Sequence, residues 1–203
     1  TSAVTRSADI ASISGDNFGT YRTNLLLNSQ NLHYWHIASN SFVAGRTLAP
    51  DGTYSATVFG SDGGGSDINI RPVKANGNTG IVLNPNTTYT YSIYAKLESG
   101  SVPTSGDILP SLFGQGVVPF NGNLTTEWKR FSTTFTTGTG SLTQGFYTGI
   151  NANTTAEIAY WGAQLEESST LTNYIPSTDT FTSRQGNATY VDSNGLIKTA
   201  KVN

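Results

Sequence analysis

The chain of 203 residues contains neither cysteine nor methionine. Without cysteine it can form no disulfide framework and no thiolate metal site, and its cysteine usage says nothing about redox compartment. It lacks an initiator methionine, and its first ten residues show no distinctive pattern. We therefore expect a mature or trimmed fragment of a longer polypeptide.

Charge is scarce, and long apolar runs are absent. Charged residues make up 12% of the chain, with 11 basic and 13 acidic residues scattered without runs. A nucleic-acid-binding protein needs a basic stripe to neutralise phosphates, so this class is excluded. No apolar run approaches the roughly 18 residues of a membrane span, and no signal peptide is visible. The sequence predicts neither a nucleic-acid partner nor membrane insertion.

What the chain has in abundance is Gly, Ser, Thr and Asn, beside 36% hydrophobic and 11% aromatic residues. This composition is typical of many short strands joined by tight turns, and it disfavours long helices. Residues 49–53 (Ala-Pro-Asp-Gly-Thr) predict a turn, because Pro presets φ and Gly accepts a positive φ. A second turn is expected at residues 84–86, and residues 61–67 are too rich in glycine for anything but a loop.

The clearest strand signal is the alternation of apolar and polar residues over 88–97, which predicts a half-buried strand. A second alternation covers 128–136. Ile158–Glu167 begins as an apolar strand and ends in a charged pair. Shorter strands are expected at 42–43, 54–59, 68–70, 108–113 and 146–150; the one at 68–70 should end, or lie at a sheet edge, because Pro72 follows it.

About nine closely spaced strands without a periodic helix indicate an all-β, two-sheet antiparallel β-sandwich of jelly-roll type. We expect Ile158–Glu167 to be the closing strand, with Trp161, Ala163 and Leu165 packed against the second sheet, because one strand cannot bury them alone. The predicted core residues are Trp161, Leu165, Tyr89, Tyr91, Ile93, Phe131 and Phe135.

Several segments carry a family resemblance through their order along the chain. They are Asn24-Leu25-Leu26-Leu27-Asn28-Ser29, Trp35, residues 49–53, residues 88–96, residues 128–132, Tyr160-Trp161-Gly162-Ala163-Gln164-Leu165-Glu166-Glu167 and Tyr174-Ile175-Pro176. Together they resemble the carbohydrate-binding-module-like jelly-roll domain of structural proteins of tailed bacteriophages, including tail fibres and other appendages. The resemblance implies a domain over residues 23–178.

The flanks resemble phage material as well. This resemblance implies that residues 1–22 are a connector or strand segment, and that residues 179–203 are a linker hairpin leading to a further module. The resemblance implies a virion location, other virion proteins as partners and assembly as a homotrimer.

We identify no set of catalytic residues in the sequence. His33 and His36 have no nearby carboxylate to complete a metal site, so we expect an exposed pair beside a packed Trp35. Glu166 and Glu167 are adjacent on a strand and therefore point to opposite faces, so they cannot flank one glycosidic bond. We expect both to be solvated charges at a strand end, and we expect a protein that is not an enzyme.

Calcium is the one cofactor that the resemblance raises. Similar jelly-roll carbohydrate modules often carry a structural Ca²⁺ that ties the first strand to the last through oxygen ligands. Asn24, Asn28 and Gln164 fall in the matching strands and are the predicted ligands, although an all-amide site lacks charge. The loop carrying Asp62 and Asp67 is an alternative.

Glycan binding needs exposed aromatic faces beside hydrogen-bonding groups. Tyr94, Tyr147, Tyr34 and Phe120 are the candidates, because they lie on polar strand faces or in loops. The working hypothesis is weak adhesion to host-surface glycan by a tail fibre or decorating appendage. The alternative is a purely architectural spacer or capsid/tail decoration that binds other virion proteins.

Overall fold

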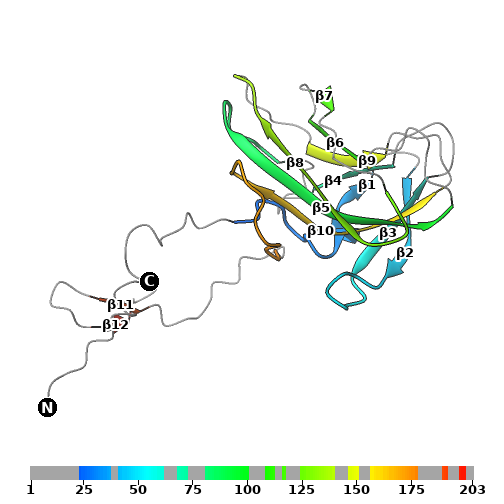
Figure 1. The fold of residues 1–203 in the computed structure, drawn as a ribbon, viewed down its shortest axis with the longest axis horizontal. Coiled ribbons are helices and arrows are strands. Elements are labelled where there is room, and N and C mark those ends of the chain that lie inside the picture. Colours follow the sequence, from blue (N-terminus) through cyan, green and yellow to red (C-terminus); the bar gives the residue numbers. More distant parts are fainter. Residues whose placement is uncertain are drawn as a thin grey trace, which may run out of the picture.

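The computed structural model describes residues 23–37, 41–61, 68–72, 81–100, 108–112, 116–117, 124–139, 146–150, 156–177, 189–191 and 197–199. These residues form two five-stranded antiparallel sheets and a separate two-stranded hairpin (Figure 1). The short 3-10 helix η2 (Leu32–Tyr34) precedes the first strand. Within the described ranges, no helix is long and apolar enough to cross a membrane.

The two sheets of the sandwich are named here after the strand β10 and the strand β9 that they contain. The β10 sheet has the order β2 (Ser41–Thr47), β3 (Ala56–Ser61), β10 (Glu157–Glu166), β5 (Thr88–Ser99) and β8 (Lys129–Thr136). The β9 sheet has the order β1 (His36–Ile37), β4 (Ile68–Arg71), β9 (Phe146–Ile150), β6 (Ile108–Leu112) and β7 (Gly116–Val117).

Strand β10 lies between β3 and β5, so the last strand of the sandwich pairs with strands from the first half of the chain. Such pairing between distant segments is a feature of jelly-roll connectivity. The expected all-β jelly-roll sandwich is confirmed, with β10 as its closing strand.

The core lies between the sheets and follows the alternation of β5. Its inward residues Tyr89, Tyr91 and Ile93 are at most 1% exposed. Strand β8 pairs with β5 without interruption, so Phe135 stacks on Tyr89 with ring centroids 5.9 Å apart. All of the predicted core residues are buried, and burial of each large side chain contributes about 1.5–3 kcal/mol.

Turn chemistry explains where several strands begin and end. The predicted turn at 49–53 forms: the Gly52 amide donates to Ala49 O at 3.0 Å, and Gly52 has φ 81°. Asn86, in the second predicted turn, also has a positive φ of 52°. Strand β4 ends at Arg71, directly before Pro72, which cannot donate to a sheet.

The segment after the sandwich contains a two-stranded hairpin. β11 (Thr189–Val191) pairs with β12 (Ile197–Thr199) in antiparallel register, with Val191 opposite Ile197. Residues 1–22 lie outside the described part of the chain, as do 178–188. The domain boundaries at 22/23 and 178/179 therefore stay predictions.

Candidate functional site

Strand β10 switches which side chains face the core at Gly162. Trp161 pairs with Tyr94 of β5, but the next pair is Gln164 with Ser92, so β10 holds one extra residue at this point. Gly162 has φ 62°, which is typical of a bulge. Ile158, Tyr160, Ala163 and Leu165 therefore pack between the sheets, whereas Trp161 does not. The predicted common face for Trp161, Ala163 and Leu165 was wrong for Trp161.

Trp161 instead anchors a second hydrophobic cluster on the outer face of the β10 sheet. It is only 4% exposed, and it packs with Ala49 and Ala56. The ring centroid of Tyr174 lies 4.7 Å from that of Trp161, and that of Tyr94 lies 5.5 Å from it. Trp161 is thus buried, as predicted, but beneath a loop and an aromatic side chain rather than a second sheet.

The segment after β10 covers the part of this outer face that carries Thr90, Arg130 and Gln164, and we call residues 167–177 the strap. Its backbone is held by side chains of the sheet: Thr90 Oγ1 donates to Ser168 O (2.8 Å), and Arg130 Nη1 donates to Thr172 O (2.7 Å). In return, the Ile175 amide donates to Gln164 Oε1 (2.6 Å). The strap is therefore a fixed part of the sandwich.

Glu166 is buried under the strap, so the expectation of a solvated charge was wrong for this residue. It is 1% exposed, and its carboxylate accepts hydrogen bonds from Gln164 Nε2 (2.7 Å), the Thr172 amide (3.3 Å) and Thr172 Oγ1. These hydrogen bonds give the buried carboxyl oxygens partners in place of water. Glu167 is exposed. The two carboxylates lie in different environments, which does not suit the paired chemistry of a glycosidase.

Asn24 ties the first described segment to the last strand. Its Nδ2 donates to Ala163 O (2.9 Å) and Ile175 O (3.0 Å), and its Oδ1 accepts the amides of Leu26 and Leu165, both at 3.1 Å. The Leu25 amide adds a backbone hydrogen bond to Leu165 O (2.8 Å). The connection to the last strand that was expected of calcium is made here by the Asn24 side chain together with backbone hydrogen bonds.

Two of the three predicted calcium ligands, Asn24 and Gln164, are already engaged in hydrogen bonds. Asn24 Oδ1 and Gln164 Oε1 both accept backbone N–H groups, and a cation would have to displace those donors. The described residues contain no group of three or more His, Cys, Asp or Glu side chains suited to a metal ion. Calcium at Asn24, Asn28 and Gln164 stays a prediction, and these hydrogen bonds argue against it. The loop alternative at Asp62 and Asp67 lies outside the described residues.

The residues predicted to contact glycan lie in different parts of the chain's structure, and the structure does not describe all of them. Tyr94 is on the outer face, as its alternation predicted, but it is half-buried between Trp161, Tyr174 and the Arg130 guanidinium, whose Cζ is 5.5 Å from its ring centroid. Tyr34 is 61% exposed at the end of η2. The backbone of Tyr147 lies in β9, opposite Ser111. The side chain of Tyr147 and the whole of Phe120 are outside the described part.

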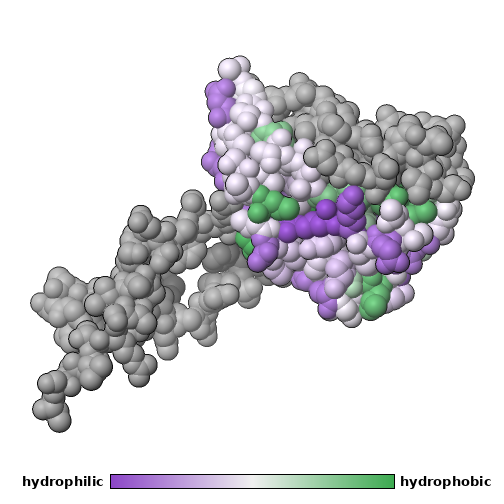
Figure 2. Space-filling view, viewed as in Figure 1, coloured by the Kyte–Doolittle hydropathy of each residue, from purple (hydrophilic) through white to green (hydrophobic). Residues whose placement is uncertain are grey.

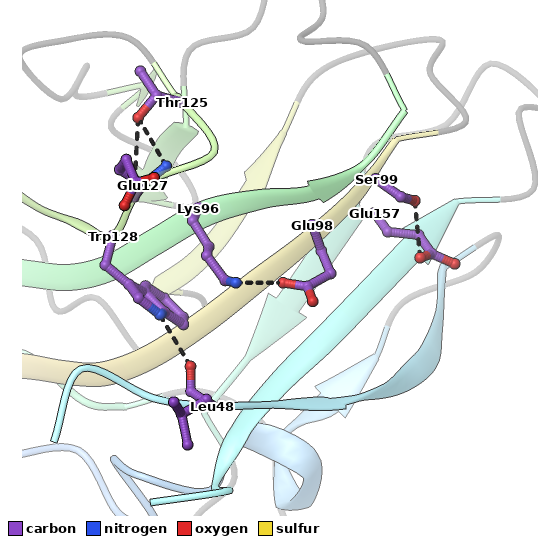
Figure 3. A network of polar contacts seen from close by, with 8 residues as sticks. All are labelled: Leu48, Lys96, Glu98, Ser99, Thr125, Glu127, Trp128 and Glu157. Atoms are coloured by element: carbon purple, nitrogen blue, oxygen red, sulfur yellow. Dashed lines mark hydrogen bonds and ion pairs between the residues drawn. The ribbon is translucent and has the colours of Figure 1, made fainter. Parts of the chain in front are cut away.

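A row of polar side chains crosses the outer face on β5 and its neighbours (Figure 3). Lys96 Nζ forms an ion pair with Glu98 Oε2 at 2.8 Å, and Ser99 Oγ donates to Glu157 Oε2 at 2.9 Å. Trp128 flanks Lys96, because Lys129 of β8 is paired with Ala95. We call Lys96, Glu98, Ser99, Trp128 and Glu157 the polar strip. Figure 2 shows a hydrophilic band across the visible face, with hydrophobic patches on either side.

The two histidines are exposed, and two of the tyrosines are buried at least in part. His33 and His36 are exposed. Burial raises the pKa of the Tyr160 and Tyr174 hydroxyls above the ordinary tyrosine value, so both phenols stay protonated at neutral pH. Tyr160 is fully buried, and its hydroxyl finds no hydrogen-bond partner in the described structure.

Sequence reasoning missed the residues that organise this face, namely Arg130, Tyr174 and the buried Glu166. The strap contacts join residues that are far apart in the sequence, such as Arg130 and Thr172. A periodic pattern of apolar residues therefore cannot reveal them. The pairing of two alternating segments, 88–97 and 128–136, was the available signal for Trp128 beside Lys96 and for Arg130 beside Tyr94.

No family model and no curated protein sequence matches this chain. Among solved structures, it is similar to the CBM22-1 and GH10 modules of the Clostridium thermocellum endo-1,4-β-D-xylanase 10B, solved with xylohexaose. The identity is 12%, the TM-score is 0.50, and the match covers 77% of this chain and 30% of that one. A family 16 carbohydrate-binding module matches with 17% identity and a TM-score of 0.47, over 70% of this chain and 99% of the module.

The tripod from the baseplate of bacteriophage Tuc2009 also matches, with 16% identity and a TM-score of 0.46, over 77% of this chain and 59% of that one. At such identities the similarity concerns the fold. The chain has the β-sandwich fold of carbohydrate-binding modules.

Proposed function

We propose that this chain is a non-catalytic module of a tailed-phage virion protein, either a tail fibre or a decorating appendage, that makes weak contacts with host-surface glycan. The ordered sequence resemblance over residues 23–178 supports the virion setting. The carbohydrate-binding-module-like fold supports the ligand class.

The observation that carries the proposal is the position of the two ends of the sandwich. Residues 24–29 run beside β10 and the end of the strap, which lie together in Figure 1. The Ser29 amide donates to Ser177 O (3.2 Å), the Ala163 amide donates to Ser29 O (3.1 Å), and Ser29 Oγ lies 2.6 Å from Tyr174 Oη. The chain therefore enters and leaves the sandwich at one place.

A module with adjacent ends projects sideways from its polypeptide, whereas an in-line spacer needs its ends at opposite poles. Lateral projection leaves the faces of the sandwich free to meet a ligand. Weak single-site affinity suffices for such a module, because many copies on one particle bind with a high effective concentration.

The test is binding of bead-coupled full-length chain to host cells before and after periodate oxidation of the surface glycans. The proposal expects bead binding that oxidation abolishes, and expects Tyr34→Ala or Tyr147→Ala to weaken it. Binding that survives oxidation, or no binding at all, would contradict glycan adhesion.

The architectural alternative is distinguished by a map of the intact particle. If the module is a decoration that binds other virion proteins, the outer face of the β10 sheet should be covered by a neighbouring chain. A freely projecting sandwich would oppose that alternative.

A further inference from the structure

We propose that the polar strip on the outer face of the β10 sheet is a binding site for a neutral polysaccharide. The inference rests on the proposed function and names a surface and a ligand class for it. None of the four aromatic residues predicted from the sequence belongs to this strip.

The first requirement for such a site is an aromatic face held in place. The Trp128 Nε1–H donates to Leu48 O at 3.0 Å, and the ammonium of Lys96 lies 5.5 Å from the indole ring centroid (Figure 3). Trp128 remains partly exposed while packing against the second cluster. Because the Lys96 ammonium lies over the ring, a sugar would pack against the part of the indole that stays exposed. It would need to immobilise little of the protein, which lowers the entropic cost of binding.

The second requirement is a set of donors and acceptors beside that face. Lys96 and Glu98 alternate on the outer side of β5, with side chains 19% and 28% exposed. Their ion pair fixes both groups but leaves other N–H donors on the ammonium and other lone pairs on the carboxylate. Ser99 and Glu157 continue the row, and their hydrogen bond also uses only one carboxylate oxygen. Sugar hydroxyls both donate and accept, so they suit this mixture.

Charge selects the ligand class. The strip contains two carboxylates, Glu98 and Glu157, and one ammonium, Lys96. Its net negative charge disfavours uronate- or phosphate-bearing chains through Coulomb repulsion. An aromatic face with mixed polar groups and no surplus of cations therefore fits a neutral, hydroxyl-rich chain.

The experiment is affinity electrophoresis of the full-length chain through gels that contain a xylan, a mixed-linkage glucan, a galactomannan or polygalacturonate. We expect retardation in at least one neutral gel and none with polygalacturonate. Trp128→Ala and Glu98→Gln should each weaken the apparent affinity about tenfold. Glu167→Gln, which changes an exposed carboxylate at the other end of β10, is the matched control and should migrate like the unmodified chain.

Trp128 also packs on the second cluster, so thermal unfolding of Trp128→Ala must be checked. If that variant is unfolded, Glu98→Gln and Lys96→Gln show whether the polar strip binds the polysaccharide. Neutral binding that these variants leave unchanged would overturn the strip while leaving the proposed adhesion intact. Stronger retardation by polygalacturonate would overturn the ligand class. No retardation in any neutral gel would overturn the strip as a site for neutral polysaccharide, whereas the proposed adhesion is decided separately by bead binding to host cells before and after periodate oxidation.

Discussion

At the scale of single residues, amide side chains do much of the joining in this sandwich. Asn24 uses both donors and both acceptor positions to connect residues 24–26 with β10 and the strap. Gln164 makes corresponding hydrogen bonds between β10 and the strap, to Glu166, Thr172 and Ile175. Because a buried polar group without a partner is costly, each amide favours one arrangement of the segments around it.

Asn24→Ala should lower the free energy of unfolding by about 2–4 kcal/mol, because it removes several part-buried hydrogen bonds at once. Urea unfolding with an unchanged m-value measures this. Asn31→Ala is the control: Asn31 Oδ1 accepts only a 3.5 Å hydrogen bond from exposed Arg46, and the expected loss is below about 0.5 kcal/mol. Equal losses for the two variants would refute the role given to Asn24.

Thermal unfolding of the unmodified chain tests the predicted calcium site. If Asn24 already makes the connection, the melting temperature should be the same in EDTA and in excess Ca²⁺. A rise with Ca²⁺ that Gln164→Ala removes would establish the metal site instead.

Tyr160→Phe should cost little at neutral pH, or should stabilise the fold, because the buried hydroxyl has no partner among the described residues. It should also change the response to alkali. Burial raises the folded-state pKa of Tyr160, so above the ordinary value near 10 the unfolded chain loses a proton that the folded chain keeps. Stability therefore falls as pH rises above about 10, by up to about 1.4 kcal/mol per pH unit for this group.

Urea unfolding between pH 8 and 11 measures that slope, and Tyr160→Phe should make it shallower. Exposed Tyr54→Phe is the control and should leave the slope unchanged. A slope that Tyr160→Phe does not alter would mean that this hydroxyl ionises equally well in both states.

At the scale of elements, the bulge in β10 decides which surface Trp161 serves. The extra residue at Gly162 turns Trp161 outward, so that the loop at 48–55 and the strap have an aromatic surface on which to pack. The positive φ of Gly162 and the nearness of Tyr94 and Tyr174 leave no comfortable space for a side chain. The bulge thus creates the second cluster.

Gly162→Ala should destabilise the chain by about 1–3 kcal/mol, because an added Cβ would lie 3.0 Å from Tyr94 Cδ2 on a residue with φ 62°. Gly45→Ala provides the comparison: it changes a strand glycine whose added Cβ would meet nothing within 4 Å. Its stability should change by less than about 1 kcal/mol. Chemical unfolding of the pair gives the difference, and comparable losses would contradict the importance of the bulge.

The elements also separate what sequence can predict from what it cannot. β5 and β8 were predictable because each buries one face, so residues such as Ile93 and Phe131 mark it at every second position. β1 and β7 have two residues each, too few to carry a period. The reversal at Gly162 was not predictable, because residues 158–163 are all apolar or aromatic and so show no alternation that an extra residue could visibly shift. Burial of Glu166 depends on the strap, whose position is a tertiary property.

At the scale of the whole molecule, β10 holds both ends of the sandwich. The first described segment bonds to Ala163 and Leu165 of β10, and the strap ends at Ser177, which bonds back to Ser29 of that segment. A sandwich closed in this way can be inserted in a longer polypeptide with only a small separation between entry and exit. The proposals about lateral display and an accessible polar strip both depend on this geometry.

The most direct test of that geometry is the distance between the two ends in solution. Because the chain has no cysteine, Thr23→Cys with Pro176→Cys gives two unique spin-label sites for pulsed dipolar spectroscopy. The Asn24 side chain donates to Ile175 O at 3.0 Å, so the labels should give one short, narrow distance distribution, below about 25 Å. A distribution near the full diameter of the domain, about 35–40 Å, would contradict the account.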